Sequence, residues 1–262
     1  MIRARLLRIV PLALLLAVSG WLIARSHAQP DRVDLARAFS APTASALLGH
    51  GEAGVDLASV VPHAIARAAA LAVVVALAGF ALGAPLGAAA ALARGTFERV
   101  VDRACDLVQS FPSFLLALAV LSAVRSPNRV HLACVFALTA WAPFARLSLA
   151  EARVLRGAAF VEAARALGAS RLRVLVVHVL PNLMAPLAVQ LGATAAAIVV
   201  SEAALSFVGL GPRDGVSLGS VLDQGVFAML RAPHVLAVGS VGVFVTSLSL
   251  LIAGRAAEPR AR

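Results

Sequence analysis

Residues 160–168 read Phe160-Val161-Glu162-Ala163-Ala164-Arg165-Ala166-Leu167-Gly168, and thirteen residues later Pro181 follows in His178-Val179-Leu180-Pro181-Asn182. This segment is rich in Arg and in residues that favour a helix, and it lies between two long apolar runs. In a chain that crosses a membrane, such a segment is a surface to which a soluble partner can bind. The rest of the sequence has to show whether the chain crosses a membrane and on which side this segment lies.

The composition indicates a membrane protein. The chain has 262 residues, of which 61% are hydrophobic and 14% charged, and its mean hydropathy is +0.92. Globular domains carry about 25% charged residues, so a soluble core of this length cannot cover so much apolar surface. The apolar runs are long and unbroken rather than alternating, which favours helices over a transmembrane barrel. We therefore predict an all-α polytopic membrane protein.

Six apolar stretches are long enough to be membrane spans. They cover approximately residues 6–24, 68–92, 107–124, 131–149, 183–205 and 235–253. Glycines inside them, such as Gly79 and Gly83, permit close packing of membrane helices. The predicted organisation is an N-terminal helix over 1–24, an external segment over 25–67, a core of five helices over 68–254 with a loop over 151–182, and a tail over 255–262.

The distribution of Arg predicts the orientation of the spans. All 23 basic residues are Arg. Fifteen of them lie in the N-terminus, in the loops after the second and fourth spans and in the C-terminus, whereas eight lie on the other side. The positive-inside rule therefore places both termini and the loop 151–182 in the cytoplasm. Because these Arg residues flank apolar runs, as topology signals do, we expect no binding to nucleic acid.

The N-terminus allows a second interpretation. Arg3-Ala4-Arg5, the apolar run that follows and Ser26-His27-Ala28 also resemble a cleavable signal peptide. The apolar run over 6–24 is longer than the usual signal core, which favours a first helix that is retained.

The loop over 151–182 is predicted to form two short helices with a sharp turn between them. Gly168 follows a helix-forming run and can serve as its C-cap, and Ser170 can serve as the next N-cap. Pro181 suits the start of the fifth span. Glu162 also has Arg neighbours at helical spacing, so it can be an ordinary surface carboxylate that pairs with them. These neighbours are Arg153, Arg156 and Arg165.

Motifs for catalysis or metal binding are weak in this chain. Without any Lys it cannot form a P-loop, so ATP hydrolysis would have to occur on another subunit. Residues 215–219, Gly-Val-Ser-Leu-Gly, match the nucleophile-elbow pattern, but no strand pattern lies beside them, which argues against a hydrolase. The six His residues are scattered without metal-ligand spacing. On the predicted topology Cys105 and Cys134 lie near opposite faces of the membrane, so we expect no disulfide.

The loop resembles the signature loop of bacterial ABC-importer permeases. Glu162-Ala163-Ala164, Gly168 and Leu180-Pro181 stand at the spacing of that pattern. The general pattern has Ile at the position of His178, but His-x-Leu-Pro-Asn is usual in the peptide/nickel branch, and residues 178–182 fit it. Three other stretches also resemble this branch. They are Asp-Leu-Val-Gln-Ser-Phe-Pro at 106–112, Trp-Ala-Pro-Phe-Ala-Arg at 141–146 and Ser-Glu-Ala-Ala-Leu-Ser-Phe-Val-Gly-Leu-Gly at 201–211.

The resemblance implies a type I ABC importer permease fold and a non-catalytic, C-type permease subunit of a bacterial inner-membrane importer for dipeptides, oligopeptides or nickel. It implies that the loop docks on an ATPase through Glu162, Ala163, Ala164, Arg165, Leu167, Gly168 and Ala169. Glu202 is a candidate for the translocation path or outer gate because an ionisable residue at such a depth is usually functional, although it can equally be an interface carboxylate that caps the following turn. Ser206 and Phe207 are candidates for lining or closing the outer mouth of the path, with plain helix packing as the alternative. The implied partners are a second permease, one or two ATPases that bind ATP and Mg, an extracytoplasmic binding protein and the lipid bilayer, with no cofactor in this chain.

Three places depart from the branch pattern. Residues 49–56 keep both Gly and the last Asp of the usual Gly-Thr-Asp-x-x-Gly-Arg-Asp, but they lack the first Asp and the Arg. Leu218-Gly219 replaces a usual Trp-Gly, and the acidic C-terminal ending is shortened. A stand-alone secondary transporter or channel is the alternative class, although such proteins often carry midplane charges or internal repeats, and neither is visible in this sequence.

Overall fold

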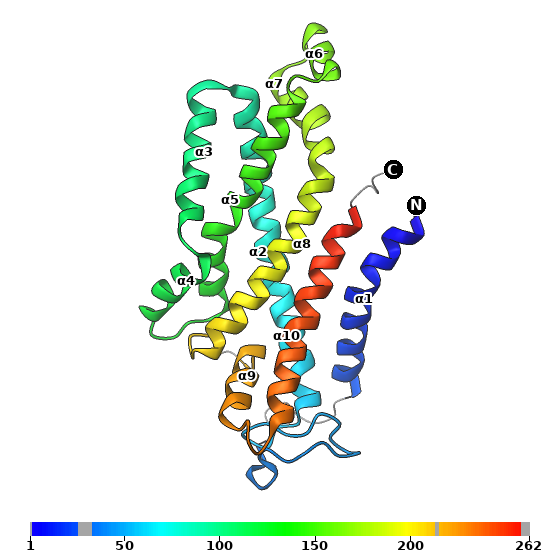
Figure 1. Ribbon diagram of the computed structural model, residues 1–262, viewed down its shortest axis with the longest axis vertical. Helices are drawn as coiled ribbons and strands as arrows, with labels where there is room; N and C mark the ends of the chain where they lie inside the picture. The colour runs from blue at the N-terminus through cyan, green and yellow to red at the C-terminus, as the bar shows by residue number, and fades with distance from the viewer. Residues whose placement is uncertain (1, 26–32, 213–214, 258–262) are drawn as a thin grey trace.

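The computed structural model describes residues 2–25, 33–212 and 215–257, and Figure 1 shows long helices lying side by side along the long axis of the molecule. The helices are α1 (Ile2–Arg25), α2 (Leu57–Ala93), α3 (Gly95–Ser110), α4 (Ser113–Ser122), α5 (Arg129–Leu155), α6 (Ala159–Ala166), α7 (Arg171–Arg173), α8 (Leu180–Phe207), α9 (Leu218–Phe227) and α10 (Pro233–Gly254). Short 3-10 turns cover Leu35–Arg37 and Arg255–Ala257, and a π-helix covers Val174–Val179. The prediction of an all-α membrane protein is confirmed.

Within the described residues, four helical segments are long and apolar enough to cross a bilayer. They are 57–93, 129–155, 171–207 and 233–254. The helices α3 and α4 together form a bent pair, which raises the number to at most five by length and composition. The apolar part of α1, Val10–Ile23, is shorter than these segments. This measure therefore supports fewer spans than the six that we predicted.

The third predicted span, over 107–124, is wrong as a single helix. The chain bends by 67° between α3 and α4, at Phe111 and Pro112. Proline has no N–H to donate to a helix, and it disfavours helical geometry in the residue before it. Phe111 accordingly has an extended backbone with φ −99° and ψ 124°.

The second helix begins earlier than the predicted residue 68. Asp56 is the N-cap of α2, and its Oδ1 accepts a hydrogen bond from the backbone N–H of Ala58 at 2.9 Å. This bond satisfies one of the N–H groups that lack a partner at a helix start. The last Asp of the 49–56 pattern therefore has a structural role.

The centre of the bundle is the packing of α2 against α5. Gly79 permits the close approach, because a Cβ on this residue would lie 2.6 Å from the carbonyl oxygen of Ala140. Small residues allow membrane helices to approach closely in this way. Further along the same pair, Phe80 and Phe144 meet edge to face with their ring centroids 6.0 Å apart.

The two ends of the molecule differ in structure. The α6 helix, the α2–α3 turn, the start of α1 and the end of α10 point toward one end, and residues 33–56 and α9 lie at the other (Figure 1). This grouping agrees with the Arg-based topology. Residues 33–56 fold by backbone hydrogen bonds, including Asp34 N to Ala53 O at 3.0 Å and His50 N to Ser40 O at 3.1 Å.

Candidate functional site

The predicted loop forms a short helix, α6, that projects beyond the ends of α5 and α8 (Figure 1). Val161 is fully buried and anchors α6 in a hydrophobic cluster with Val174 and Val179. Much of the element around this anchor is open, because Phe160 is 43% exposed and Leu167 is 90% exposed. One buried anchor thus holds an element whose large apolar side chains Phe160 and Leu167 are exposed to the solvent.

The turn after α6 is a Schellman motif. The N–H of Ala169 donates to the carbonyl of Ala164 at 3.0 Å, and the N–H of Gly168 donates to the carbonyl of Arg165 at 2.9 Å. Gly168 has φ +85°, a left-handed conformation that glycine adopts without steric cost. The predicted tight turn at Gly168 is therefore present, but the C-cap itself is Leu167, and Gly168 is the residue after it.

The second half of the loop differs from the prediction. Ser170 is an N-cap as expected, and its side chain accepts from the N–H of Arg173. However, the helix does not end before Pro181: α7 continues through the π-helix Val174–Val179 into α8. The wider π turn accommodates a proline that cannot donate a hydrogen bond. Asn182 Nδ2 donates instead to the carbonyl of His178 at 2.6 Å.

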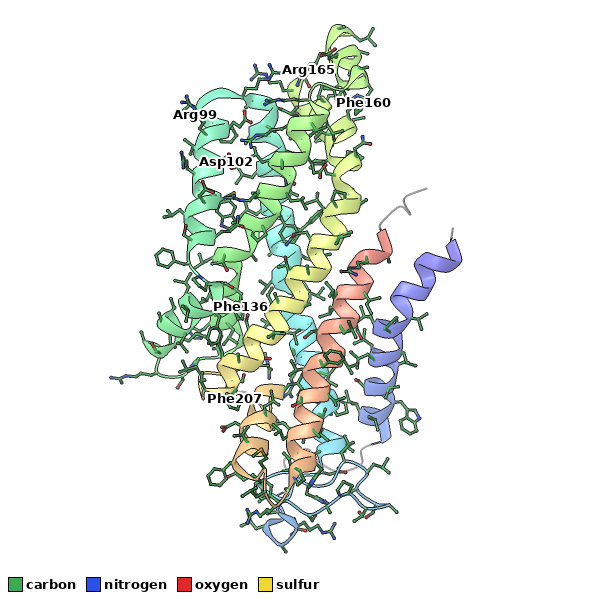
Figure 2. The ribbon with its side chains drawn as sticks, viewed as in Figure 1. Arg99, Asp102, Phe136, Phe160, Arg165 and Phe207 are labelled. Atoms are coloured by element: carbon green, nitrogen blue, oxygen red, sulfur yellow. The ribbon has the colours of Figure 1, made fainter. Side chains whose placement is uncertain are left out.

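The predicted docking residues gather on this projecting element. Glu162, Ala163, Arg165, Leu167 and Gly168 are exposed, whereas Ala164 and Ala169 are half-buried. Figure 2 shows Phe160 and Arg165 on α6, at the tip of the molecule.

The alternative in which Glu162 pairs with its Arg neighbours does not fit the described residues. Arg153 and Arg156 pair with Glu98 on α3. Glu162 has no hydrogen bond or ion pair among the described residues, so it presents a free carboxylate.

A cleft of about 370 Å³ opens on the side of the bundle. It lies between one face of α5, one face of α8 and the break between α3 and α4. Phe111 and Pro112 line it at the break, and Phe136, labelled in Figure 2, lines it from α5.

Six neutral polar side chains line this cleft, together with apolar ones. The six are Gln109, Ser113, Thr139, Gln190, Thr194 and Ser201. Gln190 Nε2 donates to the hydroxyl of Thr194 at 3.1 Å. None of the lining residues carries a charge. Polar groups at membrane depth normally face the protein interior or a water-filled cavity, so this face of the bundle is unsuited to lipid.

The cleft is not among the sites predicted from the sequence. A signal was present, since Gln190, Thr194 and Ser201 recur at helical spacing within an otherwise apolar stretch. The remaining lining residues come from other helices, and no local pattern connects them.

The three residues suggested for the outer gate lie at the end of α8, just beyond the cleft. Glu202 is 4% exposed, and its Oε1 accepts a hydrogen bond from Ser206 at 3.2 Å. Arg67 and Arg129 line the same small cavity as Glu202, so this carboxylate faces α2 and α5 and not the cleft. Ser206 is also buried, whereas Phe207 is 36% exposed (Figure 2).

The described part of the chain contains no hydrolase or metal site at the other motifs considered. Ser217 of the elbow-like pattern is the N-cap of α9, and its Oγ accepts from the N–H of Ser220 at 3.1 Å. No group of three His, Cys, Asp or Glu side chains that could hold a metal ion occurs among these residues. Cys105 is buried and Cys134 is exposed, and both are free thiols.

The fold and the site define a class of protein. A multi-pass helical bundle with a neutral polar cleft at membrane depth, and with a helix presented beyond the bundle, has the features of a transporter permease. Residues 83–262 match the family described as binding-protein-dependent transport system inner membrane component. The chain therefore belongs to this family, which is that of ABC importer permeases with the type I fold.

Two relatives narrow the branch. A Brucella suis protein named as a peptide transport system permease is 35% identical over 253 residues, which cover 95% of this chain and 82% of the relative. The glutathione transport system permease protein GsiD of Pectobacterium atrosepticum is 29% identical over 245 residues, which cover 92% of this chain and 80% of the relative. The resemblance to the peptide branch of ABC importer permeases is confirmed.

Proposed function

We propose that this chain forms half of the translocation path of an ATP-driven peptide importer and couples to an ATPase through the loop 151–182. The observation that carries the proposal is α6 itself, which is anchored by one buried Val and exposes Phe160, Leu167 and unpaired Glu162 to the solvent. Exposed apolar side chains around a charged group are typical of a surface that binds a protein partner.

The energy for transport is assigned to a partner chain. This chain has no Lys for a P-loop, so ATP and Mg would bind to one or two ATPase subunits. A second permease would complete the path across the inner membrane. An extracytoplasmic binding protein would deliver the solute to the outer end of this path. The family description, which names binding-protein-dependent transport, supports this set of partners.

The cleft is the part of the path that this chain would contribute. Its amide and hydroxyl groups can exchange hydrogen bonds with peptide groups, which are neutral and polar. Metal ions prefer carboxylate, imidazole or thiolate ligands, and none of these lines the cleft. The lining therefore favours peptides over nickel as the transported solute, in line with the names of the two relatives.

The backbone of Gly168 provides the test of coupling. Gly168→Pro would demand φ near −65° where the chain has +85°, and it would remove the N–H that bonds to Arg165. We expect ATP-driven uptake to be abolished while the protein still inserts in the membrane. Unchanged uptake would contradict the coupling role.

Gly209 is the matched control. It has φ +81°, open space at its Cβ position and the same N–H bond to the residue three before it, Ser206 at 3.1 Å. Gly209→Pro thus creates the same backbone conflict at the other end of the molecule. We expect ATPase subunits to co-purify with the Gly209 variant but not with the Gly168 variant.

A simpler measurement distinguishes this proposal from the alternative of a stand-alone secondary transporter or channel. If the purified chain, free of any ATPase, transports a solute in proteoliposomes, it is a stand-alone transporter and the permease proposal fails.

A further inference from the structure

A row of ion pairs joins α3 to α5 between the loop and the cleft, and we name it the α3–α5 ladder. Its acidic members are Glu98, Asp102 and Asp106 on α3, and its basic members are Arg146, Arg153 and Arg156 at α5. The acidic residues are spaced four apart, so they share one face of α3 over about 12 Å. Since α3 and α5 run in opposite directions, each acidic residue meets a basic one.

The centre of the ladder is Arg153, which bridges two carboxylates. Its Nε lies 2.6 Å from Glu98 Oε1, and its Nη2 lies 2.9 Å from Asp102 Oδ2. Figure 2 shows Asp102 on α3. Glu98 is only 13% exposed, so water screens its pairs less than those of an open surface.

One end of the ladder lies at the root of the coupling loop. Arg156 is the C-cap of α5 and stands three residues before α6 begins at Ala159. Its Nη1 lies 3.2 Å from Glu98 Oε2 and 3.0 Å from the carbonyl oxygen of Ala91 in the last turn of α2. Arg156 therefore joins the ends of α2, α3 and α5 where the loop departs.

The other end of the ladder lies beside the cleft. Arg146 pairs with Asp106, one turn before α3 ends at Ser110. The break at Phe111 and Pro112 follows directly and lines the cleft. Movement of α3 along α5 would therefore move one wall of the cleft.

The apolar contact of α3 with the rest of the bundle is small, so the ladder contributes much of what fixes the position of this helix. In the described structure only Val101 and Cys105 of this helix are buried. Two buried residues supply little shape complementarity against sliding, whereas paired charges at fixed spacing favour one register.

We propose that the α3–α5 ladder transmits movement of the coupling loop to the α3–α4 break and so sets the width of the cleft. Arg146, Arg153 and Arg156 are then positioning residues, which act through α3 and touch no solute. The proposal rests on the proposed function, because it requires an ATPase that moves the loop.

The test uses the intact transporter, purified through a tag on this chain and reconstituted in proteoliposomes with trialanine as the solute. The readout is the amount of peptide imported per ATP hydrolysed. Arg146→Glu places a carboxylate against Asp106, and we expect the ratio to fall about tenfold, a size that contacting charge pairs reach in double-mutant cycles. The double variant D106R/R146E restores the opposite charges, and we expect it to recover most of the loss.

Arg99 supplies the matched control on the same helix. Among the described residues its guanidinium bonds only to Thr96, at 3.3 Å, and it takes no part in the ladder; Figure 2 labels it on α3. Arg99→Glu makes the same change of charge, and we expect an unchanged ratio. Arg146→Gln removes the charge without adding repulsion, and it replaces Arg146→Glu if that variant does not insert.

A distance measurement gives a second readout that a purely stabilising role would not change. Spin labels are attached at Ser113, at the start of α4, and at Ser201 on α8, which both line the cleft, with Cys134 replaced by Ser. We expect their distance to change with ATP in the otherwise unaltered chain and to stay constant in Arg146→Glu.

Several results would overturn the proposal: an unchanged ratio in Arg146→Glu, no recovery in the double variant, or a distance that still follows ATP in Arg146→Glu. An unaltered transporter whose uptake ignores ATP would instead refute the proposed function.

Discussion

The crossing of α2 and α5 predicts that Gly79→Ala destabilises the protein, although alanine is the better helix former. The added Cβ would lie 2.6 Å from the carbonyl oxygen and 2.8 Å from the carbonyl carbon of Ala140. Ordinary non-bonded contacts are about 3.5 Å, so the shortfall is about 0.9 Å. The atoms in its way belong to the backbone, so the helices have to separate.

The magnitude follows from two opposing effects. Alanine in place of glycine favours a helix by about 1 kcal/mol. Overpacking a close contact costs about 1–3 kcal/mol, and a gap of 0.5–1 Å forfeits a quarter to a half of each van der Waals attraction along the crossing. We expect a net loss of about 2 kcal/mol, which lowers Tm by about 4–8 °C in a chain of this size.

The assay is thermal unfolding in detergent, followed by the reaction of Cys105 with a thiol-reactive fluorophore. Cys105 is fully buried and becomes accessible on unfolding, whereas the exposed Cys134 is first replaced by Ser. Gly20→Ala in α1 is the control, since nothing lies within 4 Å of its Cβ position. The reasoning is refuted if the Gly79 variant melts at or above the temperature of the Gly20 variant.

Two other substitutions have defined outcomes. Asp56→Ala removes the side chain that caps the N–H of Ala58 and should cost about 1 kcal/mol of stability in the same melting assay. Asp56→Asn keeps a hydrogen-bond acceptor, and equal losses of stability in both variants would exclude the capping explanation. Gln190→Glu places a carboxylate in the neutral cleft and should favour uptake of cationic over anionic tripeptides in a competition assay. Gln224→Glu, outside the cleft, should leave the ratio of cationic to anionic uptake unchanged. An unchanged ratio in the Gln190 variant would contradict the placement of Gln190 in the path.

Features with a local cause could be predicted from the sequence. The turn at Gly168 and the cap at Ser170 depend on a few adjacent residues, and both are present. The last span was placed at 235–253, close to Pro233–Gly254 of α10, because its apolar run has clear ends.

Other features depend on competition between local effects. A hydropathy window averages over Pro112 and cannot show that the chain turns by 67° there. In the same way, helical spacing around Pro181 suggested a boundary, whereas the chain adopts a π turn and continues. In both cases proline altered the backbone, and the surrounding packing decided whether the helix broke or continued.

The Arg residues predict topology from the sequence, but some of them also form ion pairs that the sequence does not reveal. Counting them predicted that both termini and the loop 151–182 share one side, and Figure 1 shows α6, the start of α1 and the end of α10 toward one end of the molecule. Counting treats each Arg as solvated, yet Arg153 and Arg156 are paired with carboxylates of α3. The partners are more than fifty residues away in sequence, so only the packed helices bring them together.

The distribution of charge in the bundle is consistent with a path that does not select its solute strongly. In a site partly shielded from water, a fixed charge would attract an oppositely charged solute several times more strongly than in bulk water, and it would retain that solute. Conduction requires that binding be weak enough for release. The polar groups of the cleft are all neutral, while Glu202, Arg67 and Arg129 line a separate small cavity. Under the proposed function, selection of the peptide would then belong to the binding protein, and this chain would pass peptides of different net charge.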